Sequence, residues 1–600
     1  MELSKFQIAI LEQQGHLLVE GGPGSGKTTI AIIKAESIIH QLVNRQHILF
    51  LSFSNPAVSR IAEAIDQSKL FAKEKSKQLE VQTYHAFFGQ ILKTHGYLIG
   101  LPRKIRILTT ITESVALSPI RSTPRGKKRM TAEEKEHRKK LADDELRRLA
   151  FEQGYIAFDL FASLVSELLA KGEKVRDLLC SAYPYIFLDE FQDTTDQQWE
   201  VIKFLGKKST LIALADPEQR IYDFAGAHPE RLNHYRQSFK PIEFTLGQVN
   251  HRSNGTDIAL FGNDLLTGTF RQNSYNGIEI VTYQPNYNQA YTALRIQTLQ
   301  ARRRLLESGK KDWSLAILVP TKKLMRTVSD NFRGDPEIYH TAAIDMEGAI
   351  LSAEIIALLM QPSVMGKTRD EFIALVQSYY RGKGGGAPSN TDLGEADSIG
   401  KAYERIFDAE TKKSKIPSTK LAETLKSFNA ITQFKLSGNP KDDWIRVRNS
   451  LAESKCIRLK QIAEEAKNIR LLERGTQLRD ALSANWREYG SYTDALSIVR
   501  NAFVQEYFTS NSKPETGVII MNMHKAKGKQ FDEVIIFENW PIVIRGEIKS
   551  NSDRIARGNS KHQDLTHARQ NFRVSVTRAK LKTTILTCAN DPCILLLKAS

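Results

Sequence analysis

An apolar stretch, a glycine-rich turn and a helical pattern follow one another near the N-terminus, in HLLVEGGPGSGKTTIAIIKA. Gly21, Gly26, Lys27 and Thr28 fill every fixed position of the pattern G-x-x-x-x-G-K-[ST]. Such a turn needs glycines because its backbone N–H groups point inward, where they can surround phosphate oxygens next to the positive end of a helix. A glycine-rich loop with a purely structural role is the alternative, but the strand before it and the helix after it favour a phosphate site. The pattern therefore predicts a nucleotide-binding α/β domain.

The phosphate loop gives a role to its polar groups. We expect the Lys27 ammonium to reach the β and γ phosphates of ATP, and the Thr28 hydroxyl to hold Mg²⁺. The residues expected to surround the nucleotide are Gly21, Gly22, Pro23, Gly24, Ser25, Gly26, Lys27, Thr28 and Thr29. ATP and Mg²⁺ are thus the predicted cofactors.

Three carboxylates lie within the five positions that follow the apolar run YIFL at 185–188: Asp189, Glu190 and Asp193. We expect this run to be a buried parallel strand, whose C-terminal end brings the carboxylates to the crevice of the phosphate loop. Asp189 can then bind Mg²⁺, directly or through water, and Glu190 can take a proton from a water that attacks the γ phosphate. A metal ion and a lysine would offset carboxylates that are unfavourable to bury alone.

Length and composition limit the remaining possibilities. At 600 residues the chain exceeds the ~250 to 300 residues at which a single core stops growing, so we expect several domains. Hydrophobic residues make up 41% and charged residues 26%, as in soluble globular proteins, and no apolar run approaches the ~18 residues of a membrane span. The start, MELSKFQIAILEQQGH, does not resemble a secretory signal. We therefore expect a cytoplasmic protein with no membrane partner.

The net charge and the cysteines point to further properties. A formal net charge of +17 favours a nucleic-acid partner, because basic side chains release counterions from phosphates, although basic proteins without such a partner exist. The cysteines contain no CxxC pair, so we expect reduced thiols rather than a disulfide scaffold or a thiolate metal site. They are Cys180, Cys456, Cys588 and Cys593.

Further motifs follow the phosphate loop in a recognisable order. They are SFSNPA at 52–57, TYH at 83–85, DEFQD at 189–193, ALADPEQRIYDFAGA at 213–227, VNHRSN at 249–254, MNMHKAKGKQF at 521–531 and FRVSVTRAK at 572–580. In this order, and over nearly the whole chain, the sequence resembles the UvrD/Rep/PcrA family of superfamily 1 DNA helicases.

The resemblance implies residues around the adenine and the ribose. Gln7 would read adenine, His251 would stack on it, and Lys34 would lie near the base. Gln530 stands where the family has the Glu that binds the ribose. These four residues complete the predicted ATP contacts.

The resemblance also implies the catalytic set. Gln219 would sense the γ phosphate, and Arg252 and Arg578 would act as arginine fingers. With Lys27 and Glu190 they form the predicted catalytic residues.

Contacts with single-stranded DNA are implied for a further group of residues. They are Phe53, Asn55, Thr83, His85, Tyr222, Phe224 and His524. Aromatic faces beside small polar groups suit stacked bases and phosphates.

Three positions depart from the family pattern. Ala225 stands where the family usually has Arg, Gln530 replaces Glu, and Arg573 replaces Tyr. None of these changes removes the lysine, the Mg²⁺ ligands, the base or either arginine that phosphoryl transfer requires.

The fold implied by the resemblance is α/β, with two RecA-like parallel-sheet P-loop domains that each carry a mostly helical insertion. The expected division is 1–91 and 184–243 for domain 1A, 92–183 for insertion 1B, 244–350 and 514–600 for domain 2A, and 351–513 for insertion 2B. ATP would lie between the two RecA-like domains, whose closure and opening would become steps along a strand.

Two stretches of the insertions each allow two interpretations. From Arg121 to Lys140 there are nine Lys or Arg against three Glu, so the segment either holds DNA phosphates or is a solvated charged loop and helix. The stretch RGKGGGAPSN, from Arg381 to Asn390, is either a flexible linker or a contact with duplex DNA.

The expected function is an ATP-dependent helicase or translocase on single-stranded and junction DNA, in DNA repair or phage defence, with a 3′ to 5′ direction implied by the resemblance alone. The alternative is an ATP switch or DNA sensor that unwinds little and regulates a partner nuclease in DNA repair or phage defence. Ala225 and Gln530 favour this alternative, because both change contacts that couple nucleotide to DNA. RNA remains a further possible ligand. A fused nuclease is not expected, because about 20 residues follow the last motif.

Overall fold

The computed structural model describes most of the chain. The described residues are 5–43, 45–67, 73–121, 131–217, 228–246, 253–342, 347–364, 367–383, 389–417, 419–467, 476–508, 515–544, 547–549, 551, 553–556 and 562–597. They form two compact units, each built from separate segments of the chain. The first unit comprises Met1–Phe88, Val165–Ile344 and Ser510–Ser600, and the second comprises Gly89–Leu164 and Asp345–Thr509.

One six-stranded sheet of the first unit has the order β3-β2-β6-β7-β1-β8, and every pair in it is parallel. Its strands are β1 (Leu17–Glu20), β2 (Ile48–Ser52), β3 (Leu79–Thr83), β6 (Tyr185–Leu188), β7 (Thr210–Ala215) and β8 (Ile242–Thr245). The central strands are short, apolar and buried, as expected where helices cover both faces of a parallel sheet. The prediction of a buried parallel strand at 185–188 is confirmed.

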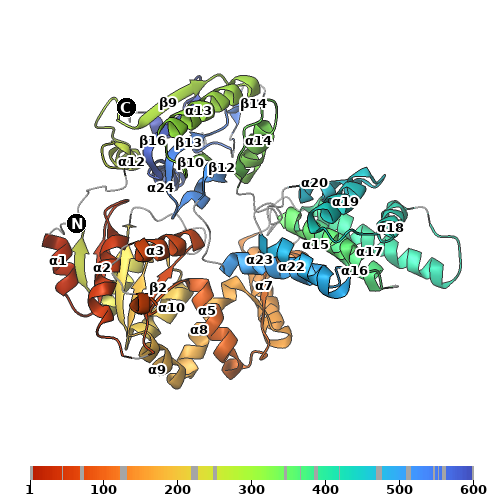
Figure 1. Ribbon diagram of the computed structural model, residues 1–600, viewed down its shortest axis with the longest axis horizontal. Coiled ribbons are helices and arrows are strands. Elements are labelled where there is room, and N and C mark those ends of the chain that lie inside the picture. The colour runs from red at the N-terminus through yellow and green to blue at the C-terminus, as the bar shows by residue number, and fades with distance from the viewer. Residues whose placement is uncertain are drawn as a thin grey trace. The chain divides into compact units, whose positions relative to one another are not determined.

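Helices flank this sheet, and together they form what we call the first lobe (Figure 1). They are α1 (Lys5–Glu12), α2 (Lys27–Ile39), α3 (Asn55–Gln67), α4 (Lys73–Ser76), α9 (Glu173–Ala182), α10 (Asp196–Gly206) and α11 (Arg231–Phe239). Two further helices, α5 (Tyr84–His95) and α8 (Phe158–Lys171), continue into the second unit. The start of α10 follows from its sequence, because the Thr195 side chain accepts from the Gln198 N–H and the Gln198 side chain accepts from the Thr195 N–H.

A second six-stranded sheet has the order β11-β12-β10-β13-β16-β9 and is also parallel throughout. Its strands are β9 (Ile278–Tyr283), β10 (Ser314–Val319), β11 (Thr341–Ala342), β12 (Gly517–Asn522), β13 (Phe531–Phe537) and β16 (Ala579–Cys588). Alternate residues of β10 enter two different cores: Ile317 and Val319 join one cluster, and Ala316 and Leu318 join the other. The sheet is therefore buried on both faces.

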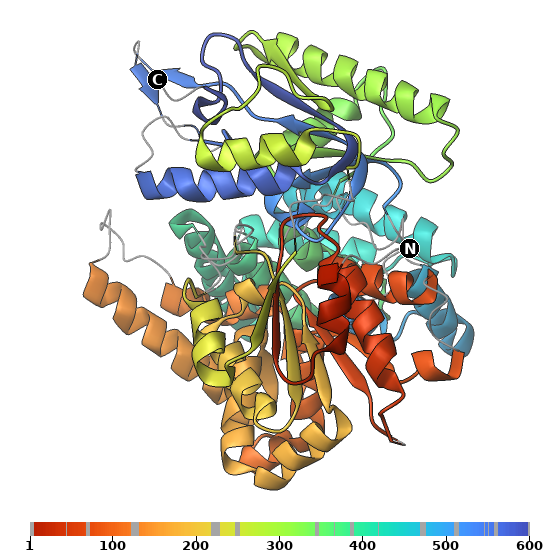
Figure 2. The same cartoon turned by 90° about the vertical axis from the view of Figure 1, so that its left-hand side faces the viewer.

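The helices beside the second sheet complete the second lobe. They are α12 (Ile258–Thr267), α13 (Tyr287–Glu307), α14 (Lys322–Phe332) and α24 (His562–Val576), and a small hairpin of β14 (Ile542–Ile544) and β15 (Glu547–Lys549) follows β13. Figure 2 shows green and blue elements together in this lobe, so segments far apart in sequence form one sheet. The prediction of two RecA-like parallel-sheet domains is confirmed.

The second unit is mostly helical, as predicted for the insertions. Its elements from the first insertion are the end of α5, the 3₁₀ helix Gly96–Ile99, β4 (Arg106–Leu108), α6 (Thr110–Arg121), α7 (Ala132–Gln153), β5 (Tyr155–Ala157) and the start of α8. Those from the second are α15 (Glu347–Met360), α16 (Lys367–Gly382), α17 (Asn390–Thr411), α18 (Lys420–Ile431), α19 (Pro440–Glu453), α20 (Ile457–Ala466), α22 (Thr476–Tyr489) and α23 (Ala495–Phe508). Both insertions share a core, because Ile111 of α6 packs in the same cluster as Leu351 of α15 and Tyr379 of α16.

The unit boundaries differ in part from the predicted domain boundaries. The predicted division includes Val165–Tyr183 in insertion 1B, whereas the contacts place these residues in the first unit. The backbone of α9 explains this placement, since the Ala182 carbonyl accepts from the His47 N–H beside β2 at 2.8 Å. The full division into 1A, 1B, 2A and 2B remains a prediction.

All four cysteines are buried, with free thiols. Within the described ranges, we find no helix that combines the length and the apolar character needed to cross a membrane.

Candidate nucleotide site

The phosphate loop joins β1 to α2 and has the geometry of an anion cradle. Gly24 and Gly26 have φ of +76° and +88°, a conformation that favours glycine. Gly21 is needed for a different reason, since a Cβ there would lie 2.5 Å from the Ser25 Oγ. That Oγ is buried and has no hydrogen-bond partner among the described residues. An orphaned hydroxyl within a loop of this shape fits a phosphate oxygen.

Lys27, the first residue of α2, folds back over its own loop. Its Nζ donates to the carbonyls of Gly21 at 2.5 Å and Gly22 at 3.1 Å, and lies 4.0 Å from an Asp216 carboxylate oxygen. Asp216 comes directly after β7 and is 2% exposed. The ammonium thus already lies within the loop that is predicted to hold phosphate.

Asp189 follows β6 and is buried beside the end of β2. Its Oδ2 accepts from the Ser52 Oγ at 2.8 Å, and its N–H donates to the Leu51 carbonyl at 2.9 Å. Burial, and then the neighbouring charge of Glu190, raise the pKa of Asp189 above its usual value. A cation would offset both effects, so this carboxylate suits Mg²⁺, and the Thr28 hydroxyl is an oxygen ligand of the kind that Mg²⁺ accepts.

Glu190 has a left-handed backbone, with φ +53°, and the charges of Lys27, Lys527 and Arg578 act on its carboxylate. Burial alone would raise the pKa of Glu190, but the charges of Lys527 and Lys27, a hydrogen bond from Gln192 and the charge of Arg578 bring that pKa down to about 2. The Gln192 Nε2 donates to Glu190 at 2.6 Å, and the Gln192 Oε1 accepts from the Asp216 N–H at 3.0 Å. One amide therefore links the predicted base to the residue after β7.

The second lobe contributes two arginines to this region, both from the motif FRVSVTRAK. Arg578 is buried, donates to the Val574 carbonyl at 2.8 Å and has a pKa lowered to about 10 by burial. Arg573 is also buried, and its Nη1 lies 3.8 Å from the Asp216 Oδ1. The structure thus brings Arg578 near the predicted base, and it adds Arg573, which had no predicted role.

Contacts between the two lobes lie beside the site. The Lys527 ammonium donates to the Asp193 carboxylate, and both side chains are buried. The Arg60 Nη1 donates to the Gly528 carbonyl at 2.8 Å. Gly528 has φ +79°, and a Cβ there would lie 3.1 Å from the Ser54 Oγ. The motifs SFSNPA, DEFQD and MNMHKAKGKQF therefore meet in the fold.

The predicted DNA residues of the first lobe occupy one edge of its sheet. Phe53 and Asn55 lie at the end of β2 and the start of α3, and Thr83 ends the neighbouring strand β3. The Phe53 ring packs on Tyr84 at 4.9 Å between centroids, and the Thr83 Oγ1 accepts from the Ala86 N–H at 3.1 Å at the start of α5. Thr83 therefore has a structural contact of its own, and its DNA contact remains a prediction.

The two histidines in that predicted set lie in different lobes. His85 is half-buried in α5. His524 lies in the 3₁₀ helix Met523–Ala526, where its ring stacks near His567 with 6.3 Å between centroids. Burial, and then the charge of His567, lower the pKa of His524, so the ring is neutral at pH 7. Contacts of both histidines with DNA remain predictions.

The described part of the chain includes the backbone of three of the residues predicted at the base and the ribose. The Lys34 Nζ donates to the carbonyls of Leu11 and Gln13, both at 2.6 Å, and so ties the end of α1 to α2. Gln530 is half-buried just before β13, and Gln7 lies in α1. Their contacts with adenine or ribose remain predictions.

Several predicted residues lie outside the described part of the chain. They are Gln219, Tyr222, Phe224, His251 and Arg252, together with the substituted position Ala225. The side chain of Gln7 and the basic positions 122–130 are also outside it.

Sequence reasoning missed Asp216, Arg60 and the contact made by Arg573. Asp216 carried a signal that could have been used, because it follows the apolar strand TLIALA as Asp189 follows YIFL. Arg60 and Arg573 carried no such signal, since their partners are distant in sequence.

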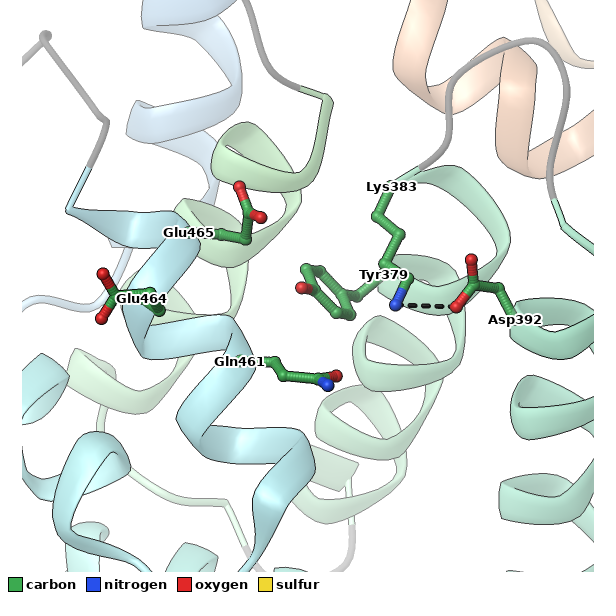
Figure 3. A pocket seen from close by; sticks show the side chains of 6 residues that line it. All are labelled: Tyr379, Lys383, Asp392, Gln461, Glu464 and Glu465. Atoms are coloured by element: carbon green, nitrogen blue, oxygen red, sulfur yellow. Dashed lines mark ion pairs between the residues drawn. The ribbon is translucent and has the colours of Figure 1, made fainter. Parts of the chain in front are cut away.

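A separate pocket of about 370 Å³ lies among helices of the second unit (Figure 3). It is lined by Tyr379, Lys383, Asp392, Gln461, Glu464 and Glu465. Lys383 pairs with Asp392 at 2.7 Å, and its ammonium lies over the Tyr380 ring, 4.5 Å from the centroid. Lys383 belongs to the RGKGGGAPSN stretch, whose residues 384–388 are not described. The start of this stretch is thus tied to α17, and its contact with duplex DNA remains a prediction.

Comparison with known proteins covers both halves of the chain. The family model of the UvrD/REP helicase N-terminal domain matches residues 3–149 and 113–240, and that of the UvrD-like helicase C-terminal domain matches residues 351–590. The ATP-dependent DNA helicase PcrA of Staphylococcus aureus is 23% identical over 627 residues, which covers 95% of this chain and 81% of that protein.

Two shorter alignments agree with this result. PcrA of Leuconostoc citreum is 24% identical over 41% of this chain and 36% of that protein. The ATP-dependent DNA helicase Rep of Escherichia coli is 25% identical over 40% of each. Together with the two parallel-sheet lobes and the charged site described above, these matches show that the chain belongs to the UvrD/Rep family of superfamily 1 ATP-dependent DNA helicases.

Proposed function

We propose that this chain hydrolyses ATP with Mg²⁺ to move 3′ to 5′ along single-stranded DNA and to open junctions, in the cytoplasm, during DNA repair or phage defence. One observation carries the proposal. The carboxylate of Glu190 accepts a hydrogen bond from Gln192 and lies near Lys27 of the first lobe and near Lys527 and Arg578 of the second, and together these groups lower its pKa to about 2. A carboxylate that can act as base and cations from both lobes are groups that phosphoryl transfer needs.

The chain's own residues would act as follows. Phosphate oxygens would replace the Gly21 and Gly22 carbonyls as acceptors of the Lys27 ammonium. Negative charge beside Glu190, and the shift of Lys27 toward the phosphates, both raise the pKa of Glu190 and make it a better base for the attacking water. Mg²⁺ held by Thr28 and Asp189 would neutralise charge on the phosphates. Arg578 would stabilise the charge of the transition state, together with Arg252.

Motion on DNA would follow from the lobe contacts. The Lys527–Asp193 pair and the Arg60–Gly528 hydrogen bond join motifs on both sides of the nucleotide site. A change in separation of the lobes on hydrolysis would therefore displace Phe53 and Asn55 relative to His524, the residues predicted to hold the strand. The net charge of +17 supports binding to the phosphate backbone.

The decisive experiment is stopped-flow translocation on single strands of increasing length, labelled at the 5′ or the 3′ end. With ATP, we expect a lag that grows with length for the 5′ label, and no such growth for the 3′ label. The Glu190→Gln variant should show no length-dependent lag. A length-dependent lag for the 3′ label alone would show movement from 5′ to 3′ and contradict the proposed direction. The absence of a lag for both labels would contradict translocation.

A second candidate is an ATP switch or DNA sensor that regulates a partner nuclease. Gln530 in place of Glu favours it, because a neutral amide bonds the ribose hydroxyls more weakly than a carboxylate does. This candidate predicts ATP hydrolysis without unwinding of a tailed duplex, intact phosphodiester bonds with the pure chain, and stoichiometric recovery of a nuclease by affinity capture. Processive unwinding by the pure chain would contradict it.

A further inference from the structure

Arg573 is a buried cation at a position where the UvrD/Rep family has Tyr. It lies in the last turn of α24 and is 1% exposed. Its Nε and Nη2 donate to the Asn263 Oδ1 of α12, at 3.2 and 3.0 Å. This fixed amide holds the plane of the guanidinium and leaves the Nη1 directed across the lobes, 3.8 Å from the Asp216 Oδ1.

Asp216 has one cation from each lobe within 4.0 Å, and the charge of Arg578 also acts on it. Its Oδ2 lies 4.0 Å from the Lys27 Nζ, and its Oδ1 lies 3.8 Å from the Arg573 Nη1. Asp216 is 2% exposed, and a carboxylate buried to this degree is costly without a countercharge. Asp216 therefore competes with any phosphate for the ammonium of Lys27.

We propose that Arg573 is a positioning residue that supplies the countercharge of Asp216 when Lys27 moves to the phosphates of ATP. The guanidinium of Arg573 is anchored to Asn263 and lies outside the phosphate loop, so it can serve Asp216 whether or not nucleotide is bound. A tyrosine at this position has no charge to offer. Arg573 of the second lobe thereby frees Lys27 of the first lobe from Asp216. The affinity for ATP would then depend on contact between the lobes. This inference rests on the ATP site proposed above.

The proposal makes a definite prediction for substitution. In Arg573→Gln, Asp216 loses one of its cations and depends more on Lys27 and Arg578, the two cations that ATP would draw to its phosphates, so ATP should bind more weakly. We expect the KM for ATP to rise about tenfold or more, which corresponds to ~1.4 kcal/mol or more, while kcat falls by a smaller factor. Arg573→Lys should restore most of the affinity, since it keeps the charge.

Asp216→Asn provides the critical test, because it removes the carboxylate that attracts the Lys27 ammonium from 4.0 Å away. In that background, Arg573→Gln should change the KM for ATP less than twofold. Binding of a non-hydrolysable ATP analogue should show the same coupling, which separates binding from the chemical step.

The matched control is Arg569→Gln on the same helix. Arg569 also reaches α12, where its Nη1 donates to the Leu265 carbonyl at 2.7 Å. If packing of α24 on α12 were the cause, this control would raise the KM as much as Arg573→Gln does.

Three results would overturn the proposal: an unchanged KM in Arg573→Gln, an equal rise in the Asp216→Asn background, or an equal rise in Arg569→Gln. If Arg573→Gln fails to fold, Asn263→Ala replaces it and should raise the KM in the same direction, with the same dependence on Asp216. An unchanged KM in Asn263→Ala would also count against the proposal. Absence of ATP hydrolysis by the wild-type chain would instead contradict the proposed function.

Discussion

Lys525 is half-buried near two other lysines, and these surroundings lower the pKa of its ammonium group. Burial, and then the charges of Lys322 and Lys529, lower the pKa of Lys525 to about 8 from its usual 10.5. The folded chain therefore binds this proton more weakly than the unfolded chain does. Between about pH 8 and 10.5 the unfolded state holds more protons at this site, so the contribution of Lys525 to stability improves as the pH rises, and its full penalty applies below pH 8.

We predict that Lys525→Met is more stable than the wild type at pH 7, by roughly 1 kcal/mol for each unit of pKa shift that is removed. The difference in stability between this variant and the wild type should narrow as the pH rises from 8 to 10. Thermal unfolding at a series of pH values measures it. Lys582→Met is the control, because Lys582 is paired with Glu279 at 2.9 Å in the same lobe. A constant difference across this range would show that Lys525 is not the titrating group.

Glu190 carries the second prediction at this scale. Glu190→Gln keeps the shape of the side chain but cannot accept the proton, so we expect hydrolysis to fall by at least ~10² while ATP and DNA still bind. Glu200→Gln is a suitable control, since Glu200 pairs with Lys203 on the surface of α10. DNA-stimulated hydrolysis near the wild-type rate in Glu190→Gln would remove Glu190 from the role of base.

At the scale of elements, the β1–α2 connection depends on two kinds of glycine. Gly21 has no room for a side chain, because a Cβ would lie 2.5 Å from the Ser25 Oγ. Gly22 has no atom within 4 Å of a Cβ and no positive φ. We predict that Gly21→Ala lowers the Tm of the nucleotide-free chain by several degrees and that Gly22→Ala leaves it nearly unchanged. Equal Tm values for both variants would contradict the crowding around Gly21.

The phosphate loop and the strand at 185–188 could be predicted from the sequence, because short stretches of residues determine both. The backbone preferences of the residues from Gly21 to Thr28 favour the loop. The apolar composition of YIFL is enough to predict a buried strand. In contrast, Asp216 and Arg573 are far apart in sequence and meet because two separate sheets place them together. Likewise, the placement of Val165–Tyr183 in the first unit depends on contacts such as that of Ala182 with His47. No local pattern encodes such contacts.

At the scale of the whole molecule, the buried pair of Lys527 and Asp193 joins the two lobes of the first unit. Removing one partner takes the nearest opposite charge away from a buried charge, which typically costs ~3–5 kcal/mol, whereas removing both is much milder. We predict that Lys527→Met and Asp193→Asn each lower the Tm more than the double variant does. A double-mutant cycle measures this coupling, and purely additive effects would show that the pair is not energetically linked.

The charge of the whole chain leads to the last prediction. Basic residues at 121–140 either contact DNA phosphates or remain solvated, and positions 122–130 lie outside the described residues. Replacing Lys127, Lys128 and Arg129 with Ala should weaken DNA binding and reduce the slope of log K against log salt by up to about three, if all three contact phosphates. Titration at several salt concentrations measures the slope. An unchanged slope would favour the solvated interpretation.

The order of strands in the second sheet also has a consequence for synthesis of the chain. Strand β10 ends at Val319, but its neighbours β12 and β13 begin at Gly517 and Phe531. At ~5–20 residues per second, a ribosome would take on the order of 10 to 40 s to deliver them. During that time β10 would have both edges uncovered, whereas the strands of the first lobe are complete at Thr245. The newborn second lobe is therefore where shielding by chaperones during translation would matter.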